Sequence, residues 1–376
     1  MQTQLYKAAV SPLLDRLDSE TWHERARHAL HYAEHSRGLL RLLEHLASPG
    51  GRFVDRRLAV ELDGIQLENP VLVGAGWDKS GIAVRGLYAL GFSGVEVGSV
   101  LEAAQPGNPG PRQWMVAPGV ALNRLGFNSP GVEAVARNLE RYRGTGIPIG
   151  ISLGKNRSVP PSAAPEAHAA VASRLYDYAA YFAINVSSPN TPGLRALQDK
   201  RPLGEIVAAV NEAMDARDDR KPVFVKVAPE LSDHAILDVI EVVADHGLSG
   251  IIATNSTDDP ELKARYGERW RHEPGGLSGD DRRYRALSTA KVARIYAETR
   301  GRIQIIGVGG VKDAPTALEK LQAGATAVQV VTAIRGEGIA VASRINRGLA
   351  AWLDREGVGC LSEVVGAQHR SALAVT

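Results

Sequence analysis

Polar residues of a few types follow the short apolar runs of this chain, at the points where the runs end. Two lysines are among them: Lys79 follows the first run, and Lys226 lies inside the run Val-Phe-Val-Lys-Val. The others are mostly amides and hydroxyls, and include Ser99, Ser152, Asn185, Ser187, Ser188, Asn190, Thr254, Asn255, Ser256 and Thr332. Such groups suit a planar ligand held by many hydrogen bonds, with the lysines placed where negative charge must be stabilised.

Acids and histidines are nearly missing from the same positions. A metal-dependent hydrolase would need clustered His, Asp or Glu, and a carboxylate acid–base pair is missing as well. Gly309 and Gly310 close the seventh run, at the place where many barrel enzymes turn bare backbone N–H groups toward a phosphate. These features favour a phosphorylated planar cofactor. Flavin mononucleotide fits best, and no metal is expected.

Each of these residues also has a purely structural interpretation. Lys226 could be one half of a buried ion pair, Asn185 and Asn255 could form turns, and Ser188-Pro189 could be a plain turn. A ligand site accounts for all of them together, whereas the structural roles must be assumed one by one.

The apolar runs and the segments between them predict the fold. Stretches with helical spacing separate the runs, for example residues 203–216 and 284–299. The eight runs cover residues 71–73, 94–97, 147–153, 181–186, 223–227, 250–254, 303–308 and 327–331. Eight βα units of this length predict an α/β protein with a (β/α)8 TIM barrel over residues 58–356. An open doubly wound sheet is the alternative, but no Gly-x-Gly-x-x-Gly opens a helix after the first run.

Residues 1–50 differ from the barrel region and predict a small N-terminal helical extension. Apolar residues recur at helical spacing before Asp18, and Ser19 can cap a second helix that continues to Leu46. The helical pair is either a cap on the barrel or an apolar surface for lipid or a greasy ligand. Five of the ten histidines lie here, and we interpret them as solvated helix surface rather than metal ligands.

Composition excludes several classes of protein. The 376 residues contain 44 Lys and Arg against 42 Asp and Glu, a net charge of +2, so bulk binding to nucleic acid is not expected. Cys360 is the single cysteine, which excludes an intramolecular disulfide and fits a reducing compartment. No apolar run reaches the roughly 20 residues of a spanning helix, and no signal peptide is evident. Residues 357–376 are expected to form a frayed tail.

Several motifs resemble the dihydroorotate dehydrogenase family. Among them are GAGWDKSG (74–81), LNRLGFNSPG (122–131), AINVSSPNTPGLRALQ (183–198), VFVKVAPELS (223–232) and IIGVGG (305–310), in the family's order. The N-terminal region, with Asp18-Ser19-Glu20 and His23, is similar to the quinone-dependent, membrane-associated class 2. The resemblance implies oxidation of dihydroorotate to orotate in pyrimidine (UMP) biosynthesis, with FMN as hydride acceptor and a membrane quinone as final electron acceptor. It also implies a peripheral location on the cytoplasmic side of the cell membrane, reached through the N-terminal helices.

The resemblance also assigns roles to individual residues. Ser188 matches the catalytic base of this class. The substrate would be bound by Lys79, Asn123, Asn185, Asn190, Asn255 and Ser256. The flavin would be bound by Ala75, Gly76, Lys79, Ser99, Ser152, Asn185, Lys226, Thr254, Gly279, Gly309, Gly310, Val331 and Thr332.

The sequence departs from the family pattern mainly where the electron acceptor should approach. Met115 stands where an arginine is expected at the quinone entrance, and Val331 replaces a usual tyrosine. Ser152 replaces an asparagine, and Trp77 takes a place usually held by Leu or Phe. Two alternatives therefore stay open: an FMN-dependent paralogue with another acceptor or dihydropyrimidine substrate, and a non-catalytic, membrane-docked flavin-binding protein.

Overall fold

A closed barrel of parallel strands forms the centre of the computed structural model, which describes residue 6, residues 18–215, residue 217 and residues 219–373. The strand order around the barrel is β10-β12-β13-β3-β4-β7-β8-β9. In chain order the strands are β3 (Val71–Val73), β4 (Gly94–Val100), β7 (Ile149–Leu153), β8 (Tyr181–Asn185), β9 (Val223–Val227), β10 (Gly250–Ala253), β12 (Gln304–Val308) and β13 (Ala327–Val330). Each predicted run is one of these strands, so the TIM barrel is confirmed.

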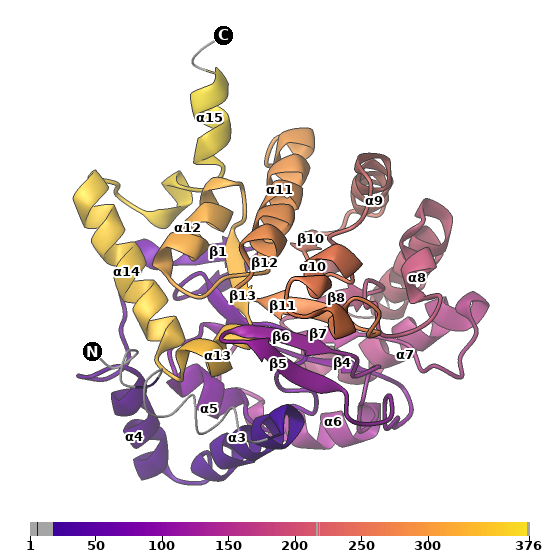
Figure 1. The fold of residues 1–376 in the computed structure, drawn as a ribbon, viewed down its shortest axis with the longest axis horizontal. Coiled ribbons are helices and arrows are strands. Elements are labelled where there is room, and N and C mark those ends of the chain that lie inside the picture. Colours follow the sequence, from indigo (N-terminus) through magenta and orange to yellow (C-terminus); the bar gives the residue numbers. More distant parts are fainter. Residues whose placement is uncertain (1–5, 7–17, 216, 218, 374–376) are drawn as a thin grey trace.

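Helices surround the barrel and bury its outer face (Figure 1). They are α5 (Val84–Ala89), α6 (Val132–Leu139), α7 (Ala164–Leu175), α8 (Lys200–Asp215), α9 (Asp233–Asp245), α11 (Arg282–Thr299), α12 (Ala314–Gln322), α13 (Thr332–Glu337) and α14 (Val341–Glu356). The strands are apolar and almost entirely buried because helices cover one side and the barrel interior the other. Large side chains such as Phe182 and Phe224 fill this core.

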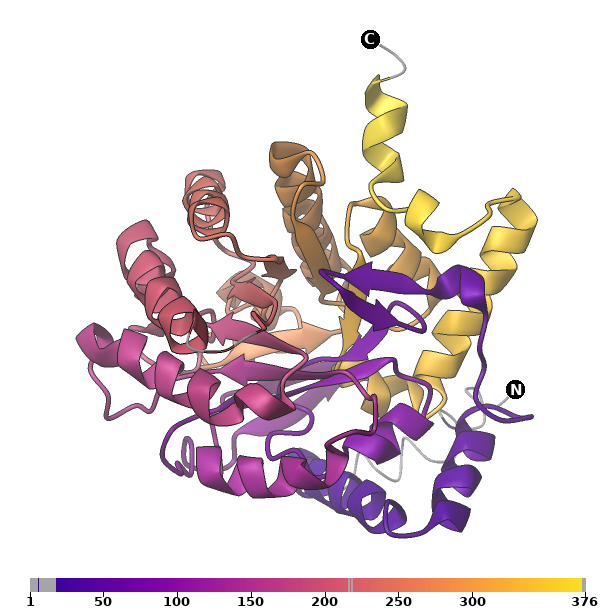
Figure 2. The same ribbon diagram turned by 180° about the vertical axis from the view of Figure 1, so that it is seen from behind.

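Two small sheets flank the barrel. β1 (Val60–Leu62) and β2 (Ile65–Leu67) form an antiparallel hairpin, whose Asp63 accepts a hydrogen bond from Ser249, just before β10. The hairpin therefore lies near the amino ends of the barrel strands, and Figure 2 shows it from behind. β5 (Gln113–Ala117), β6 (Val120–Asn123) and β11 (Gly276–Gly279) form a sheet with the order β11-β6-β5, and α10 (Pro260–Ala264) precedes β11.

The N-terminal extension differs in detail from its prediction. The helix expected before Asp18 lies outside the described residues, apart from Tyr6. The second helix is wrongly predicted as continuous: α3 (Ser19–Ala33) and α4 (Arg37–Ala47) are separate, because Ser36 begins a new helix by accepting a hydrogen bond from the N–H of Leu39. Asp18, not Ser19, caps α3, since its carboxylate accepts from the N–H of Thr21 at 2.8 Å.

The sequence predicted a frayed C-terminal tail, but part of this segment packs against the barrel. Leu361 and Val364 are buried in the main core, the backbone N–H of Gly366 donates to the carbonyl of Leu321 on α12, and α15 (Ala367–Leu373) follows. Apolar side chains at these two positions attach the segment to the barrel. Within the described residues, none of the helices has the length and apolar character needed to cross a membrane.

Candidate active site

The carboxyl ends of the barrel strands surround one cavity. Its walls contain the predicted residues Ala75, Gly76, Lys79, Ser99, Asn123, Asn185, Ser188, Asn190, Lys226, Thr254, Asn255, Ser256, Gly279, Gly309, Gly310, Val331 and Thr332. Ser152 is the exception: it is fully buried behind Ser99, and the two hydroxyl oxygens lie 2.8 Å apart. Parallel strands bring their carboxyl ends to one edge, which is why residues far apart in the chain meet here.

Amides from neighbouring strands form a connected hydrogen-bond network on one wall. Asn185 donates to the hydroxyl of Ser99 at 2.8 Å. Asn255 donates to the hydroxyl of Ser187 at 3.0 Å and to the side-chain oxygen of Asn185 at 3.3 Å. Because each amide is fixed by another polar group, its remaining hydrogen-bonding capacity is directed rather than free to rotate. The turn interpretation of Asn185 and Asn255 does not account for this network.

Ser188 lies in the loop after β8, beside two further amides. Its hydroxyl oxygen accepts a hydrogen bond from the backbone N–H of Asn190 at 3.2 Å, and the side chain is only 6% exposed. The side-chain amide of Asn190 donates to Asn123 on β6 at 3.0 Å. Asn190 Oδ1 is buried and has no hydrogen-bond partner among the described residues, so it can accept from an N–H of a bound ring.

Lys226 lines the cavity and also has the buried ion-pair partner that the structural interpretation predicted. Its Nζ lies 3.5 Å from Oε1 of the fully buried Glu96 on β4. The other carboxylate oxygen accepts from Tyr181 at 3.1 Å and from Gln329 at 2.6 Å. Register places Lys226 directly beside Asn185 on β8. The ammonium group is therefore held at the floor of the cavity by a buried carboxylate.

Lys79 is held by a tightly bonded loop after β3. The carboxylate of Asp78 is inaccessible to solvent and accepts from the backbone N–H groups of Gly81 at 3.0 Å and Ala83 at 2.7 Å. Lys79 itself is 8% exposed, and burial lowers the pKa of its ammonium group from 10.5 to about 8. It is thus largely charged at neutral pH, in a cavity wall with little water.

Glycines and hydroxyls form another edge of the cavity. Gly279 has a positive φ of 97°, and a Cβ there would lie 2.1 Å from the carbonyl oxygen of Gly119, so only glycine fits. Beside it the hydroxyls of Ser278 and Thr332 lie 3.0 Å apart. Gly309 and Gly310 complete this edge. Exposed backbone N–H groups and hydroxyls are a donor set suited to a phosphate.

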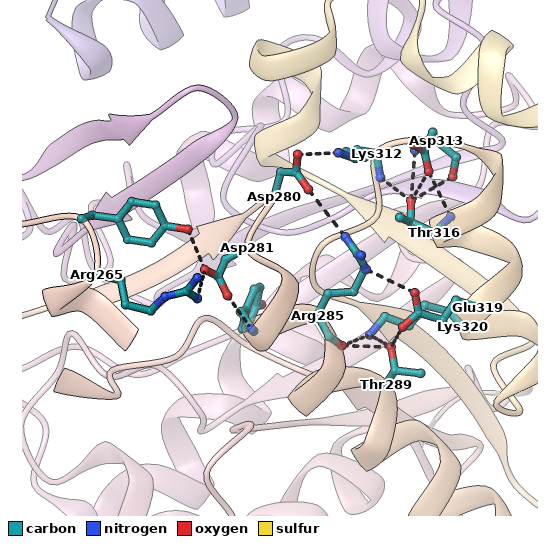
Figure 3. Close-up of polar contacts among 12 residues, drawn as sticks. Arg265, Asp280, Asp281, Arg285, Thr289, Lys312, Asp313, Thr316, Glu319 and Lys320 are labelled. Carbon is teal, nitrogen blue, oxygen red and sulfur yellow. Dashed lines mark hydrogen bonds and ion pairs between the residues drawn. The ribbon is translucent and has the colours of Figure 1, made fainter. Parts of the chain in front are cut away.

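A network of charges supports this edge from behind, as Figure 3 shows. Arg285 on α11 lies between Asp280, at 3.5 Å, and Glu319, at 3.2 Å, and Lys312 contacts Asp280 at 2.5 Å. A Cβ at Gly310 would collide with the side chain of Arg285. The buried Lys320 of α12 donates to Ser288 and Thr289 of α11, and burial lowers its pKa to about 7. These contacts connect α11 and α12 to the edge formed by Gly279, Gly309 and Gly310, which we call the glycine edge.

The side of the cavity next to α3 is more apolar. Trp22, Trp77 and Met115 line it, together with His23 and Arg335. The prediction that the N-terminal histidines are solvated surface is wrong for His23, which is 7% exposed and bonds through Nε2 to the carbonyl oxygen of Trp77 at 2.5 Å. Burial lowers its pKa to about 3, so the imidazole is neutral at physiological pH and its Nε2–H donates.

Sequence reasoning missed several of these residues. Glu96 and Gln329 were detectable, because each is a polar residue inside an apolar run, as Lys226 is. His23 was named in the resemblance to class 2 but was interpreted as solvated surface. Arg335 carried no such signal, since its position depends on how α3 and α13 pack. The described residues contain no group of three His, Cys, Asp or Glu that could hold a metal ion.

Comparisons with known proteins agree with this geometry. The family model of dihydroorotate dehydrogenase matches residues 57–353. The dihydroorotate dehydrogenase (quinone) of Chloroflexus aurantiacus is 43% identical over 354 residues, which cover 92% of this chain and 96% of that protein. The protein of the same name from Anaeromyxobacter dehalogenans is 40% identical over 365 residues, 96% of this chain and 97% of its own length.

A solved structure gives the same result for the fold. The crystal structure of DHODH from Eimeria tenella in complex with ferulenol matches with a TM-score of 0.83 and 30% identity, covering 95% of this chain and 97% of that one. The match extends well beyond the barrel residues to nearly the whole chain. This chain therefore belongs to the dihydroorotate dehydrogenase family.

Proposed function

We propose that this protein oxidises dihydroorotate to orotate in pyrimidine biosynthesis, with flavin mononucleotide as cofactor and a quinone as final electron acceptor. The observation that carries the proposal is the joint placement of Ser188, Lys79 and Lys226 in one cavity walled by amides. In the overall reaction the substrate loses two hydrogens, formally a proton and a hydride from adjacent carbons. The quinone gains two electrons and two protons and leaves as quinol.

The residues present fit a flavin mononucleotide. The glycine edge, with Thr332 and Gly309, supplies donors for the phosphate, while Ser99, Asn185 and Lys226 face the space for a ring system. Gln329 Oε1 is a buried acceptor with no partner among the described residues, and Gln329 also lines the cavity. When bound, the flavin accepts hydride from the substrate and passes the electron pair onward. Lys226 would balance the negative charge of the reduced cofactor.

The substrate is expected to lie between the amide wall and Lys79. Dihydroorotate is a small ring with several N–H and C=O groups and one carboxylate. Asn123, Asn190 and Asn255 offer both donors and acceptors for the ring. Lys79 supplies the charge that pairs with the carboxylate, and its burial strengthens that pairing because water screens it poorly.

Ser188 is the proposed base. A serine hydroxyl is a weak base in water, so the reaction needs an aligned site with little water, in which the hydroxyl can pass its own proton onward as it accepts one from the substrate carbon. The N–H of Asn190 donates to Ser188 Oγ and would stabilise negative charge that develops there. This contact also directs the hydroxyl hydrogen away from Asn190.

Anaerobic reduction of the bound flavin tests the proposal. The protein, purified with its flavin, is mixed with dihydroorotate in the absence of oxygen, and the absorbance near 450 nm is recorded. We expect the yellow colour to bleach and orotate to form in an equal molar amount. A flavin that stays oxidised with dihydroorotate, but bleaches with dithionite, would contradict the proposed activity and favour the non-catalytic alternative.

The identity of the oxidant needs a separate test because Met115 removes a charge from the expected quinone entrance. The paralogue alternative predicts fast reoxidation by a soluble acceptor instead. Reoxidation of the dihydroorotate-reduced protein by a short-chain ubiquinone, by oxygen and by fumarate should be compared at equal concentration. We expect the quinone to be fastest, and a preference for fumarate would favour the alternative.

We also propose that the N-terminal helices contact a membrane peripherally, on its cytoplasmic side. α4 exposes Leu42 and Leu46, each 52% exposed, and α3 exposes Tyr32 at 73%. Co-sedimentation with vesicles of phosphatidylglycerol and phosphatidylethanolamine tests this contact. We expect the wild-type protein to sediment with vesicles and Leu42→Glu/Leu46→Glu to remain largely in solution. Equal sedimentation of the two proteins would contradict the proposal.

A further inference from the structure

The α3 side of the cavity has the character of a pocket for an apolar, planar electron acceptor. Its apolar surface comes from Trp22 and Trp77 and from Met115. Indole rings offer flat faces for stacking, and methionine adapts its shape to a ring. An acceptor such as a quinone also has carbonyl oxygens that gain negative charge during reduction, so this side needs a positive group as well.

Arg335 brings a guanidinium to this pocket from α13, at the opposite end of the chain. The side chain is 7% exposed, lines the cavity, and donates through Nη1 to the hydroxyl of Ser19 at 2.7 Å. Its Cζ lies 5.1 Å from the centroid of the Trp22 ring. The orientation is therefore fixed by a hydrogen bond on one side and an aromatic face on another.

Further contacts keep this arrangement in place. Gln113 on β5 donates to the same hydroxyl of Ser19 at 3.1 Å. Arg112, its neighbour, forms an ion pair with Glu20 at 2.7 Å. α3, β5 and α13 thus meet at the first turn of α3, and Arg335 is the residue that connects this junction to the cavity.

Apart from Lys79, the other polar groups on this side do not supply positive charge. Met115 is neutral, and His23 is buried with its Nε2–H committed to the carbonyl oxygen of Trp77. Lys226 belongs to the floor of the cavity, where it pairs with Glu96. Lys79 is a second buried cation near α3, where its charge interacts with those of Glu24 and Glu20, but its proposed partner is the carboxylate of the substrate. Among the other described residues that line the α3 side, the positive charge comes from Arg335. Arginine suits the task because its planar guanidinium stays charged even when buried.

We propose that Arg335 is a specificity-determining residue for the quinone, whose carbonyl oxygen its guanidinium contacts and stabilises as negative charge develops there. The inference rests on the proposed function. The family resemblance leads us to expect a positive charge at position 115. In this chain residue 115 is a neutral methionine, and Arg335, on a different element that faces the same pocket, supplies the charge instead. Arg335 acts in reoxidation by the quinone, whereas oxidation of dihydroorotate depends on the amide wall and Ser188.

Removing the guanidinium at position 335 and placing an arginine at position 115 tests the proposal directly. The variants are Arg335→Met, Met115→Arg/Arg335→Met, and Arg335→Lys, each purified with bound flavin. Arg344→Met is the matched control: it removes a guanidinium that contacts α13 through Glu337 at 3.1 Å but does not line the cavity. The rate of flavin reduction by dihydroorotate and the rate of reoxidation by a short-chain ubiquinone are measured separately by stopped-flow absorbance.

We expect Arg335→Met to slow reoxidation by the quinone about 10- to 100-fold, the usual cost of a lost charge-assisted hydrogen bond. Flavin reduction by dihydroorotate should stay within about twofold of wild type. The double variant should regain at least part of the lost rate, Arg335→Lys should keep more of the wild-type rate than Arg335→Met does, and Arg344→Met should remain close to wild type. Unchanged reoxidation in Arg335→Met, or an equal fall in both half-reactions, would overturn the inference.

A binding measurement separates this inference from the proposed function. Trp22 and Trp77 line the pocket, so quinone binding should quench part of the tryptophan fluorescence of the protein. We expect the dissociation constant for the ubiquinone to rise about tenfold or more in Arg335→Met and to recover in the double variant. Failure of dihydroorotate to reduce the wild-type flavin would reject the proposed function alone, whereas equal quinone affinity in all variants would reject the role of Arg335.

Discussion

The ammonium nitrogen of Lys226 lies 3.5 Å from Oε1 of Glu96, and both side chains are buried inside the barrel. The pair comes from strands that are not adjacent in the barrel, β4 and β9. Tyr181 and Gln329 hold the second carboxylate oxygen, so the glutamate cannot turn away from the lysine without losing hydrogen bonds. One buried carboxylate thereby sets the position of the charge at the floor of the cavity.

Removing one partner of this pair should cost more stability than removing both. We expect Lys226→Met to lower the free energy of unfolding by about 3–5 kcal/mol, because Glu96 is left as an uncompensated buried charge. Glu96→Gln/Lys226→Met should recover a large part of that loss. Urea unfolding of the wild type, the two single variants and the double variant forms a double-mutant cycle that measures the coupling.

The exposed pair of Lys200 and Glu241 is the control for this cycle. Its atoms lie 2.5 Å apart, but the side chains are 51% and 58% exposed. Water and salt screen such a pair, so its coupling should be below about 1 kcal/mol. A coupling between Lys226 and Glu96 no larger than that of the control would contradict a structural ion pair in the barrel.

Ser188→Ala should slow the bleaching of the flavin by dihydroorotate about 10²- to 10⁴-fold, the usual contribution of a positioned base. The flavin content and the affinity for orotate should change little, since the substitution removes only the hydroxyl group. Ser256→Ala provides the comparison: it should raise the KM for dihydroorotate and leave the limiting rate nearly unchanged. A limiting rate for Ser188→Ala close to wild type would assign the proton transfer to another group.

The affinity for orotate should fall with rising pH above about 8. Burial lowers the pKa of Lys79 to about 8, so the ammonium group is charged below that pH and loses its proton above it. The carboxylate of orotate then loses its partner. Titrations followed by the visible spectrum of the flavin between pH 6.5 and 9.5 check this prediction, with Lys79→Met expected to bind weakly at every pH. An affinity that is constant up to pH 9.5 would show that Lys79 does not hold the carboxylate.

The barrel and most of its cavity could be predicted because both follow local rules. A strand buried on both faces is a continuous apolar run, and the residues that end such runs meet at one edge of a parallel barrel. Ser188 and Asn255 were identified on this basis, 67 positions apart in the chain. Lys226 is unusual because it is a charged residue inside an apolar run. The sequence of that run does not identify the residue that faces Lys226 across the barrel.

Features that depend on packing between distant elements could not be predicted. Arg335 reaches Ser19 across 316 positions of sequence, and nothing in either segment specifies that contact. His23 lies on a helix with other histidines, and its burial is decided by the approach of Trp77. Ser152 was assigned to the cofactor by resemblance, but the structure places it behind Ser99. Local patterns identify the elements, while their mutual contacts come from the assembled fold.

The buried imidazole of His23 should make the protein less stable in mild acid. Its pKa is lowered from 6.5 to about 3, chiefly by burial, so between these values the unfolded chain binds a proton that the folded protein does not. The contribution of the neutral imidazole to the free energy of unfolding is therefore fully present above about pH 6.5. It is lost as the pH falls toward 3, at about 1.4 kcal/mol per pH unit.

His23→Gln keeps a donor for the carbonyl of Trp77 but does not titrate. Between pH 7 and pH 5 we expect the wild type to lose about 2 kcal/mol more free energy of unfolding than this variant. His28→Gln, on the exposed face of the same helix, is the matched control and should show the wild-type loss. The buried His168, whose pKa is about 4, is present in all three proteins and cancels in the comparison. If His23→Gln loses as much stability as the wild type, His23 is accessible to water in solution and α3 does not stay closed over the cavity.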